Sequence, residues 1–163
     1  MVKISQSRSQ ILDLLSSIPD PEIPVVNIIE MGMVRDVILT EDGCDVILMP
    51  TYNGCPAMAQ IEADILVLLK REQIAPAKVT IVLDPAWTTD WMTEEAKEKL
   101  RNYGIAPPLH SSCNSDQFAR NTIRCPICNS VQTSLVSRFG STPCKSLYRC
   151  DSCFEPFEYF KCH

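Results

Sequence analysis

Two pairs of cysteines near the C-terminal end of the chain could bind a metal ion. The motifs CPIC and CDSC are both C-x-x-C pairs, and 21 residues separate them. Each pair offers two sulfur atoms from one tight turn, and two such turns together form a tetrahedral thiolate site. The sequence therefore predicts a four-cysteine metal site whose ligands are Cys125, Cys128, Cys150 and Cys153.

Zinc is the metal we expect at this site, since closed four-cysteine sites with this spacing are mostly structural zinc sites. Four thiolates also bind a single iron ion or an iron–sulfur cluster, so iron is the alternative. Cys144 and Cys162 belong to the same region of the chain. We expect them to be buried or free thiols, with ligand exchange or a second metal as the alternative.

Cys55 is a further candidate for a reactive or metal-binding cysteine, and it lies in the stretch PTYNGCPAMAQIEADILVLLK. Apolar residues recur there every three or four positions, which predicts a helix, and Pro56 suits its first position. Cys55 then lies at or near the N-cap, where the helix dipole and free N–H groups lower the pKa of a thiol. We expect a reactive thiolate or a metal ligand, and a half-buried structural cysteine is the alternative.

Two carboxylates precede these features in a loop stiffened by proline. Asp20 and Glu22 lie two residues apart in DPEIP, so in an extended segment their side chains point to the same side. Such a pair can bind a hard cation or a basic partner, and capping of loop N–H groups is the alternative. We also expect the segment that leads to Cys55 to lie near this loop.

The elements that position these groups predict an α+β domain over residues 1–103. A strand, a helix and a second strand in succession indicate a right-handed crossover, so the third strand is expected to run parallel to the second. Asn27 and Glu30 can form a capping box, and Thr93 suits the N-cap of the last helix. We expect helices on a three-stranded sheet, with helices near 11–18, 56–69 and 94–103 and strands near 34–40, 44–50 and 78–84.

The remainder of the chain divides into a linker and a small β domain. Residues 104–120 contain two prolines and three serines without periodicity, which is typical of a linker. Residues 121–163 contain both C-x-x-C pairs and two β-like segments, at 131–137 and 144–149. So short a segment needs a metal to stabilise it, and we therefore predict a zinc-ribbon domain.

Composition and charge exclude several classes of function. Residues 1–120 carry 10 Lys and Arg against 17 Asp and Glu, so the body is acidic and nucleic acid is not an expected partner. No apolar run approaches the ~20 residues of a membrane span, and the polar N-terminus lacks a signal core, so we expect a cytoplasmic protein with reduced cysteines. Neither His110 nor His163 is placed to serve as a base, and we do not expect an enzyme.

Three motifs also resemble a known family. DPEIPVVNIIEMG, PTYNGCPA and DPAWTTDWMTEEAKEKL are similar to the small domain shared by bacterial SufT-like proteins and the eukaryotic cytosolic iron–sulfur targeting factors. That resemblance covers roughly residues 8–103. The ribbon, with its stretches FGSTPCKSLYRC and EPFEYFKCH, narrows the resemblance further. The whole chain resembles the PaaD family (also called PaaJ), whose members are accessory subunits encoded with bacterial phenylacetyl-CoA 1,2-epoxidase.

The resemblance implies maturation of an iron–sulfur cluster or metal centre, without catalysis. The matching residues are Asp20, Glu22, Thr51 and Cys55, and Cys55 falls on the family's reactive cysteine. Cys55 is then expected to hold iron or a cluster transiently, with a second ligand from a dimer mate or a client. The implied partners are the oxygenase and reductase components of the epoxidase and iron–sulfur assembly proteins. A stoichiometric structural or electron-relay subunit of the oxygenase is the alternative.

Overall fold

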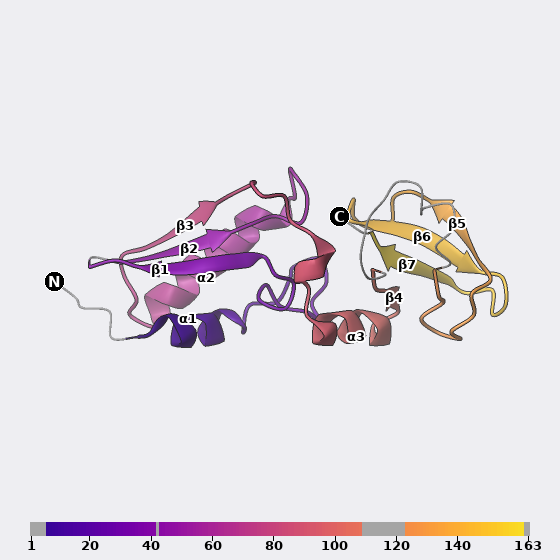
Figure 1. Cartoon of the computed structure of the whole chain (residues 1–163), viewed down its shortest axis with the longest axis horizontal. Helices are drawn as coiled ribbons and strands as arrows, with labels where there is room; N and C mark the ends of the chain where they lie inside the picture. Colours follow the sequence, from indigo (N-terminus) through magenta and orange to yellow (C-terminus); the bar gives the residue numbers. More distant parts are fainter. Residues whose placement is uncertain (1–5, 42, 109–122, 162–163) are drawn as a thin grey trace. The chain divides into compact units, whose positions relative to one another are not determined.

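The computed structural model describes residues 6–41, 43–108 and 123–161, which form two compact units (Figure 1). The first unit ends at Trp87 and the second begins at Thr88. The first combines helices with a three-stranded sheet, and the second contains the cysteine-rich β ribbon, so the predicted α+β class is confirmed. Within the described ranges, no helix is both long enough and apolar enough to cross a bilayer.

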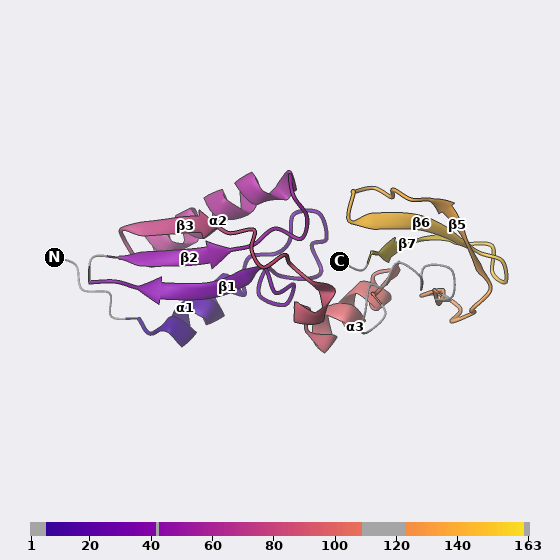
Figure 2. The ribbon, with the colours of Figure 1, turned by 45° about the horizontal axis from the view of Figure 1, so that its top comes forward.

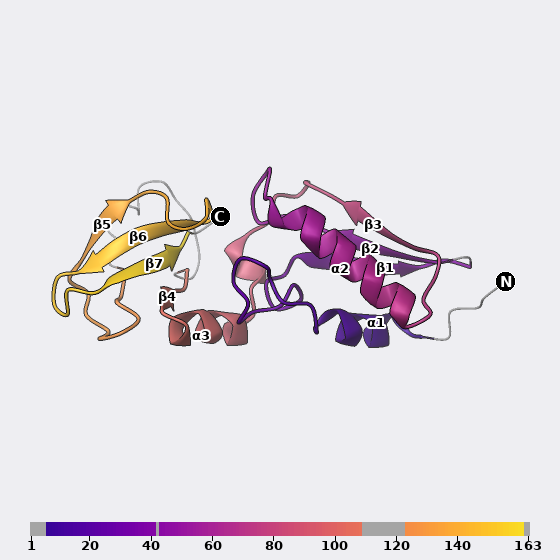
Figure 3. The same ribbon diagram turned by 180° about the vertical axis from the view of Figure 1, so that it is seen from behind.

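The sheet of the first unit has the order β1-β2-β3. The hairpin strands β1 (Val34–Leu39) and β2 (Cys44–Leu48) are antiparallel, and β3 (Ala77–Ile81) is parallel to β2, as predicted. Alternate residues of β2 are buried, because one face of the strand is turned toward the helices. The helix α2 (Ala57–Arg71) crosses that face (Figure 3), and α1 (Arg8–Leu15) packs against β1 and α2.

A tight loop system joins α1 to β1 and holds the carboxylate segment. The N–H groups of Ile29 and Glu30 donate to the Asn27 side-chain oxygen at 3.0 and 2.8 Å. The Asn27 N–H donates in turn to a Glu30 carboxylate oxygen at 3.1 Å, which completes the predicted capping box. Gly32 then closes the turn with a φ of 67°, a conformation that glycine adopts at little cost.

The indole of Trp87 closes the core of the first unit. Its side chain is 4% exposed, and its Nε1–H donates to the Met31 carbonyl at 3.0 Å. This bond ties the segment that follows β3 to the loop system described above. Trp87 is therefore a packing residue and contributes no exposed aromatic surface.

The second unit begins with a short 3-10 helix, η1 (Thr89–Trp91), and α3 (Glu94–Asn102). The Thr93 hydroxyl accepts the Ala96 N–H at 3.0 Å, which confirms the predicted N-cap. A four-stranded sheet of order β4-β7-β6-β5 follows, and Figure 2 labels its strands β5, β6 and β7. Its strands are β4 (Ile105–Ala106), β5 (Thr133–Ser137), β6 (Lys145–Cys150) and β7 (Pro156–Phe160).

Two of these strands, β4 and β7, were not expected from the sequence. Residues 105 and 106 fall in the predicted linker, yet both are buried and pair with β7 as a parallel strand. Burial of Ile105 and Ala106 against the sheet stabilises this short strand. Most of the predicted linker lies outside the described residues, and the predicted boundaries at 103 and 121 stay predictions.

Candidate metal centre and cysteine site

The four predicted ligands of the ribbon come together in space. The sulfur atoms of Cys125, Cys128, Cys150 and Cys153 all lie within 4.8 Å of one another. Cys125 and Cys153 are 3.8 Å apart, and Cys128 and Cys150 are 3.5 Å apart. A zinc ion with Zn–S bonds of about 2.3 Å holds tetrahedral sulfur ligands about 3.8 Å apart. The cluster therefore has the donor set and the spacing that zinc requires.

Each cysteine pair sits in a tight knuckle turn. In the first knuckle, residues 125–130, the Asn129 N–H donates to the Cys125 carbonyl at 2.9 Å and Asn129 has a φ of 62°. The second knuckle, residues 150–155, has Phe154 at the corresponding place with a φ of 64°. Asn tolerates the left-handed conformation well, whereas nothing in the sequence signals a left-handed Phe.

Backbone N–H groups prepare the second knuckle for a thiolate. The N–H groups of Cys153 and Ser152 donate to the Cys150 sulfur at 3.5 and 3.4 Å. These hydrogen bonds, that from Cys153 first, together with contacts from the Cys128 and Cys153 thiols, lower the pKa of Cys150 to about 6, while the pKa values of Cys128 and Cys153 are raised. Because a metal binds the thiolate, Cys150 is the ligand that loses its proton first, and metal binding displaces the protons of the other two.

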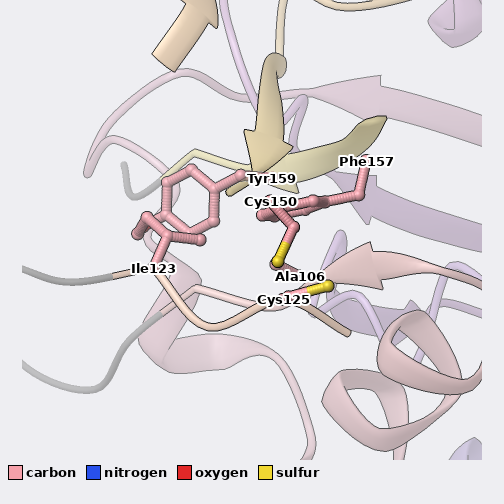
Figure 4. Close-up of a cluster of buried hydrophobic side chains, with 6 residues drawn as sticks. All are labelled: Ala106, Ile123, Cys125, Cys150, Phe157 and Tyr159. Carbon is pink, nitrogen blue, oxygen red and sulfur yellow. The ribbon is translucent and has the colours of Figure 1, made fainter. Parts of the chain in front are cut away.

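The metal centre lies at the edge of a small apolar core (Figure 4). Tyr148 stacks on Phe157 and meets Tyr159 edge-on, with both pairs of ring centroids 5.9 Å apart. Cys125 and Cys150 are buried, but Cys128 is exposed, so one side of the site faces solvent. The members of the cluster are Ala106, Ile123, Cys125, Cys150, Phe157 and Tyr159.

The second candidate site surrounds Cys55 in the first unit. Cys55 immediately precedes Pro56, which is the N-cap of α2, so the predicted helix is present and begins one residue later than expected. Gly54 has a φ of 82° and turns the chain toward the helix, while the Cys55 N–H donates to the Tyr52 carbonyl at 3.3 Å. The thiol is held inside this turn and is 9% exposed.

The pKa of the Cys55 thiol is raised, so the expected lowering is wrong. Burial is the main cause, and the negative charges of Glu22 and Asp20 raise the pKa further. Hydrogen bonds from the Ala57 N–H and the Tyr52 side chain act in the opposite direction but do not prevail. At neutral pH the thiol therefore keeps its proton. Tyr52 was missed as a neighbour, although its place three residues before Cys55 in the same turn is a usable signal.

The carboxylate loop lies beside Cys55, as expected, because both of its acids act on the thiol. Asp20 is 7% exposed, and its Oδ1 accepts the N–H groups of Glu22 and Ile23 at 2.7 and 2.9 Å. That oxygen therefore caps the loop, which was the alternative considered from the sequence. Thr51, the fourth predicted residue, is buried four positions before Cys55.

The described residues around Cys55 provide no preformed set of three metal ligands. Among the residues that the structure describes, the ribbon cysteines are the one group of three or more His, Cys, Asp or Glu side chains close enough to share an ion. Cys144 is buried with its sulfur 3.0 Å from the Thr142 hydroxyl, as expected for a structural thiol. Cys162, His110 and His163 lie outside the described residues.

Comparison with protein families matches both parts of the chain. Residues 8–83 match the family described as iron–sulfur cluster assembly protein, and residues 110–161 match the PaaD zinc beta ribbon domain. The match over the second segment agrees with the four-cysteine geometry. Together the two matches include Cys55 and the four ribbon cysteines.

Curated relatives divide into two kinds. An Escherichia coli (strain K12) protein named as a putative 1,2-phenylacetyl-CoA epoxidase subunit is 52% identical over 94% of this chain and 92% of its own length. The "Fe-S protein maturation auxiliary factor YitW" of Bacillus subtilis (strain 168) is 35% identical over 55% of this chain and 89% of its own. The second kind, which includes a SufT protein of Staphylococcus aureus, matches about half of the chain.

Solved structures resemble the first part of the fold. A Bacillus anthracis protein described as a domain of unknown function, DUF59, has a TM-score of 0.53 and 28% identity, over 57% of this chain and 90% of its own. A conserved hypothetical protein of Thermotoga maritima has a TM-score of 0.52 and 25% identity, over 61% of this chain and 98% of its own. Both likenesses support the predicted helix-and-sheet domain.

Proposed function

The chain belongs to the PaaD family of 1,2-phenylacetyl-CoA epoxidase components, and on that premise we propose that it is a non-catalytic accessory factor that helps to load iron or an iron–sulfur cluster into this multicomponent monooxygenase. Its relatives named as iron–sulfur maturation factors support the accessory role, and the relative named for the epoxidase supports the client. Its partners are then the oxygenase and reductase components and the iron–sulfur assembly proteins.

The environment of the Cys55 thiol is the observation that carries this proposal. Burial and the neighbouring charges of Glu22 and Asp20 keep the thiol protonated at neutral pH. The same carboxylates attract a ferrous ion or a cluster, and a bound cation displaces the proton because ligation requires the thiolate. Exchange of proton for metal makes the loaded state reversible, which is what delivery to a client requires.

The scarcity of ligands around Cys55 fits transient rather than permanent binding. The described residues near Cys55 offer no set of three ligand atoms, so iron held there needs a further ligand from the client or from a second copy. A shared ligand set also explains how iron would leave, since client ligands can replace the protein's own. In this proposal Thr51, which is buried four residues before Cys55, has a structural role and is not a ligand.

The ribbon has a structural role in this proposal. Its four thiols form a closed site for zinc, and closed four-cysteine sites stabilise small domains that lack a large core. Iron in place of zinc would give the ribbon a redox-active centre. The metal content of the purified full-length chain separates the two, and we expect one equivalent of zinc for the four ligands.

The test is the iron and sulfide content of the oxygenase and reductase, each produced with the wild-type chain, with Cys55→Ala and without the chain. We expect one component to lose metal in both the variant and the omission. Cys44→Ala is a matched control, because Cys44 is the other buried cysteine described in the same unit and its pKa is also raised by burial. Full loading in all preparations would remove the maturation role.

The alternative function is a stoichiometric structural or electron-relay subunit of the oxygenase. The name of the E. coli relative, which calls it a subunit, is the observation that favours this role. Such a role requires the chain to remain with the oxygenase at constant stoichiometry through purification. It also requires a redox-active iron in the ribbon if electrons are to pass, whereas zinc does not change oxidation state.

A further inference from the structure

Phe154 adopts a backbone conformation that its side chain makes unfavourable. Its φ is 64°, in the left-handed region where a Cβ atom crowds the backbone and where a bulky residue is an outlier. The corresponding place in the first knuckle is held by Asn129, with a φ of 62°, and Asn tolerates this region well. The fold of the knuckle therefore does not explain why a phenylalanine stands at residue 154.

Packing within the chain does not offset this strain. The Phe154 side chain is 70% exposed, so most of its apolar surface remains in water. Strained residues that persist without a folding benefit are typical of functional sites. The combination of a left-handed backbone and an exposed ring therefore points to a contact with another molecule.

A second exposed apolar side chain stands on the other knuckle. Ile127 is 60% exposed and lies between the two cysteines of the first knuckle. The Ser130 and Ser152 hydroxyls are 2.7 Å apart and join the two turns, so the knuckles hold each other in place. The exposed Cys128 lies on the same turn as Ile127. We call Ile127 and Phe154 the knuckle pair.

Charged side chains of both signs flank the knuckle pair. An arginine immediately precedes the first cysteine of each knuckle, and both Arg124 and Arg149 are exposed. Arg124 donates to the Asn129 carbonyl at 3.4 Å, and Arg149 lies 3.7 Å from Asp151, so both guanidinium groups lie at the turns. Asp151 and Glu155 are exposed in the second knuckle and carry the opposite charge, so we expect a partner to present polar groups of both signs around an apolar recess.

We propose that the knuckle pair is the surface by which the ribbon binds the oxygenase component of the epoxidase, entering an apolar recess rimmed by polar side chains. This inference rests on the proposed function for the identity of the partner. The division among the relatives supports it. Those that match only the first part of the chain are named as maturation factors, whereas the relative that also spans the ribbon is named for the epoxidase.

The test compares Phe154→Asn with the wild-type full-length chain in binding to the purified oxygenase. Asn copies the residue at the equivalent position of the first knuckle, so the variant relieves the strain while it removes the ring. We expect affinity to fall by at least about tenfold, as for a central aromatic contact. Zinc content and thermal stability should be unchanged or improved, and binding by the wild-type chain should weaken as salt is raised.

Phe139→Asn is the matched control. Phe139 is 66% exposed on the same ribbon, and it lies under the Lys161 ammonium group, outside the knuckles and outside the left-handed region. We expect this variant to bind like the wild type. Equal losses in the two variants would overturn the assignment to the knuckle pair, and so would loss of zinc from Phe154→Asn, which would make the ring structural.

The outcomes also separate this inference from the proposed function. If Phe154→Asn binds the oxygenase normally while Cys55→Ala still fails to load iron, the knuckle pair is not the docking surface and the maturation role stands. If Phe154→Asn loses binding while the oxygenase acquires full metal without the chain, the docking surface stands and the maturation role is wrong.

Discussion

Replacement of Asp20 separates the two roles that its carboxylate could have, a loop cap or a charge beside Cys55. Its Oδ1 accepts two backbone N–H groups, at 2.7 and 2.9 Å, in a side chain that is 7% exposed. Asp20→Ala leaves both donors without this acceptor, and we expect a loss of about 2–3 kcal/mol in the free energy of unfolding. Asp20→Asn keeps the oxygen and loses the charge, so we expect a loss of about 1 kcal/mol.

The assay is urea unfolding of the full-length chain, followed through the fluorescence of the buried Trp87. Trp91 contributes to the same signal, so hydrogen exchange by mass spectrometry is used to assign the change to the first unit. Equal destabilisation by Ala and Asn would refute the reasoning, because it would show that the two hydrogen bonds to Oδ1 do not hold the loop. Glu22→Gln is the control, since the Oδ1 contacts do not involve the Glu22 side chain.

The same variants change the chemistry of Cys55. The charges of Glu22 and Asp20 raise the thiol pKa beyond the effect of burial, so Asp20→Asn and Glu22→Gln should each lower the pKa. The measurement is the pH dependence of iodoacetamide alkylation at Cys55, with Cys55→Ala as the blank. A pKa that stays unchanged or rises in both variants would contradict the placement of the carboxylates beside the thiol.

Three further predictions concern the stability of the two units. Glu158→Gln should destabilise the ribbon by about 3 kcal/mol, because it leaves the Lys145 ammonium group, 4% exposed and 2.8 Å from Glu158, without its counter-charge. Burial alone would raise the pKa of Glu158, but hydrogen bonds from Lys145 and Ser141 lower it below its ordinary value of 4.5. The ion pair therefore stabilises the folded state above pH 4.5, and this stabilisation is lost as the pH falls through the pKa that Glu158 has in the folded chain. Acid titration followed by circular dichroism should show a smaller stability loss in Glu158→Gln than in the wild type. Trp87→Phe should cost the first unit about 1–2 kcal/mol, since a buried Met31 carbonyl loses its donor, and urea unfolding checks this. Removal of metal by a chelator should unfold the ribbon and leave the first unit folded, and hydrogen exchange should rise only in the ribbon.

Local sequence signals predicted much of the first unit and the start of α3 in the second. The Asn27–Glu30 capping box, the Thr93 N-cap and the β1–β2 hairpin all depend on residues close together in the chain. The strand β7 was not predicted, although Phe157 and Tyr159 alternate with Pro156 and Glu158 in PFEYF. By contrast, β4 has two residues and no period of its own, so only its pairing with β7 defines it.

The ligands of the ribbon were predictable because the two C-x-x-C pairs show both the thiol groups and their spacing directly in the sequence. The sign of the Cys55 pKa shift was not, because it is a sum of opposing effects. The position before α2 supplies the Ala57 N–H that lowers the pKa, and this was visible locally. Burial and the carboxylates of Asp20 and Glu22, more than thirty residues earlier in the chain, reverse the sign and are set by the tertiary fold.

The chain thus contains two cysteine sites that differ in the number of ligands they bring together more than in thiol protonation. In the second knuckle, N–H groups lower the pKa of Cys150 to about 6, but the pKa values of Cys128 and Cys153 beside it are raised, so a metal must displace protons there as well. Around Cys55, burial and two acids raise the pKa, so that thiol also binds a metal only when the cation's charge displaces the proton. Four sulfur atoms within 4.8 Å of one another can hold an ion permanently, whereas the described residues around Cys55 offer no set of three ligands. The two cysteine sites therefore fit the separate tasks of stabilising the ribbon and carrying a transferable ion.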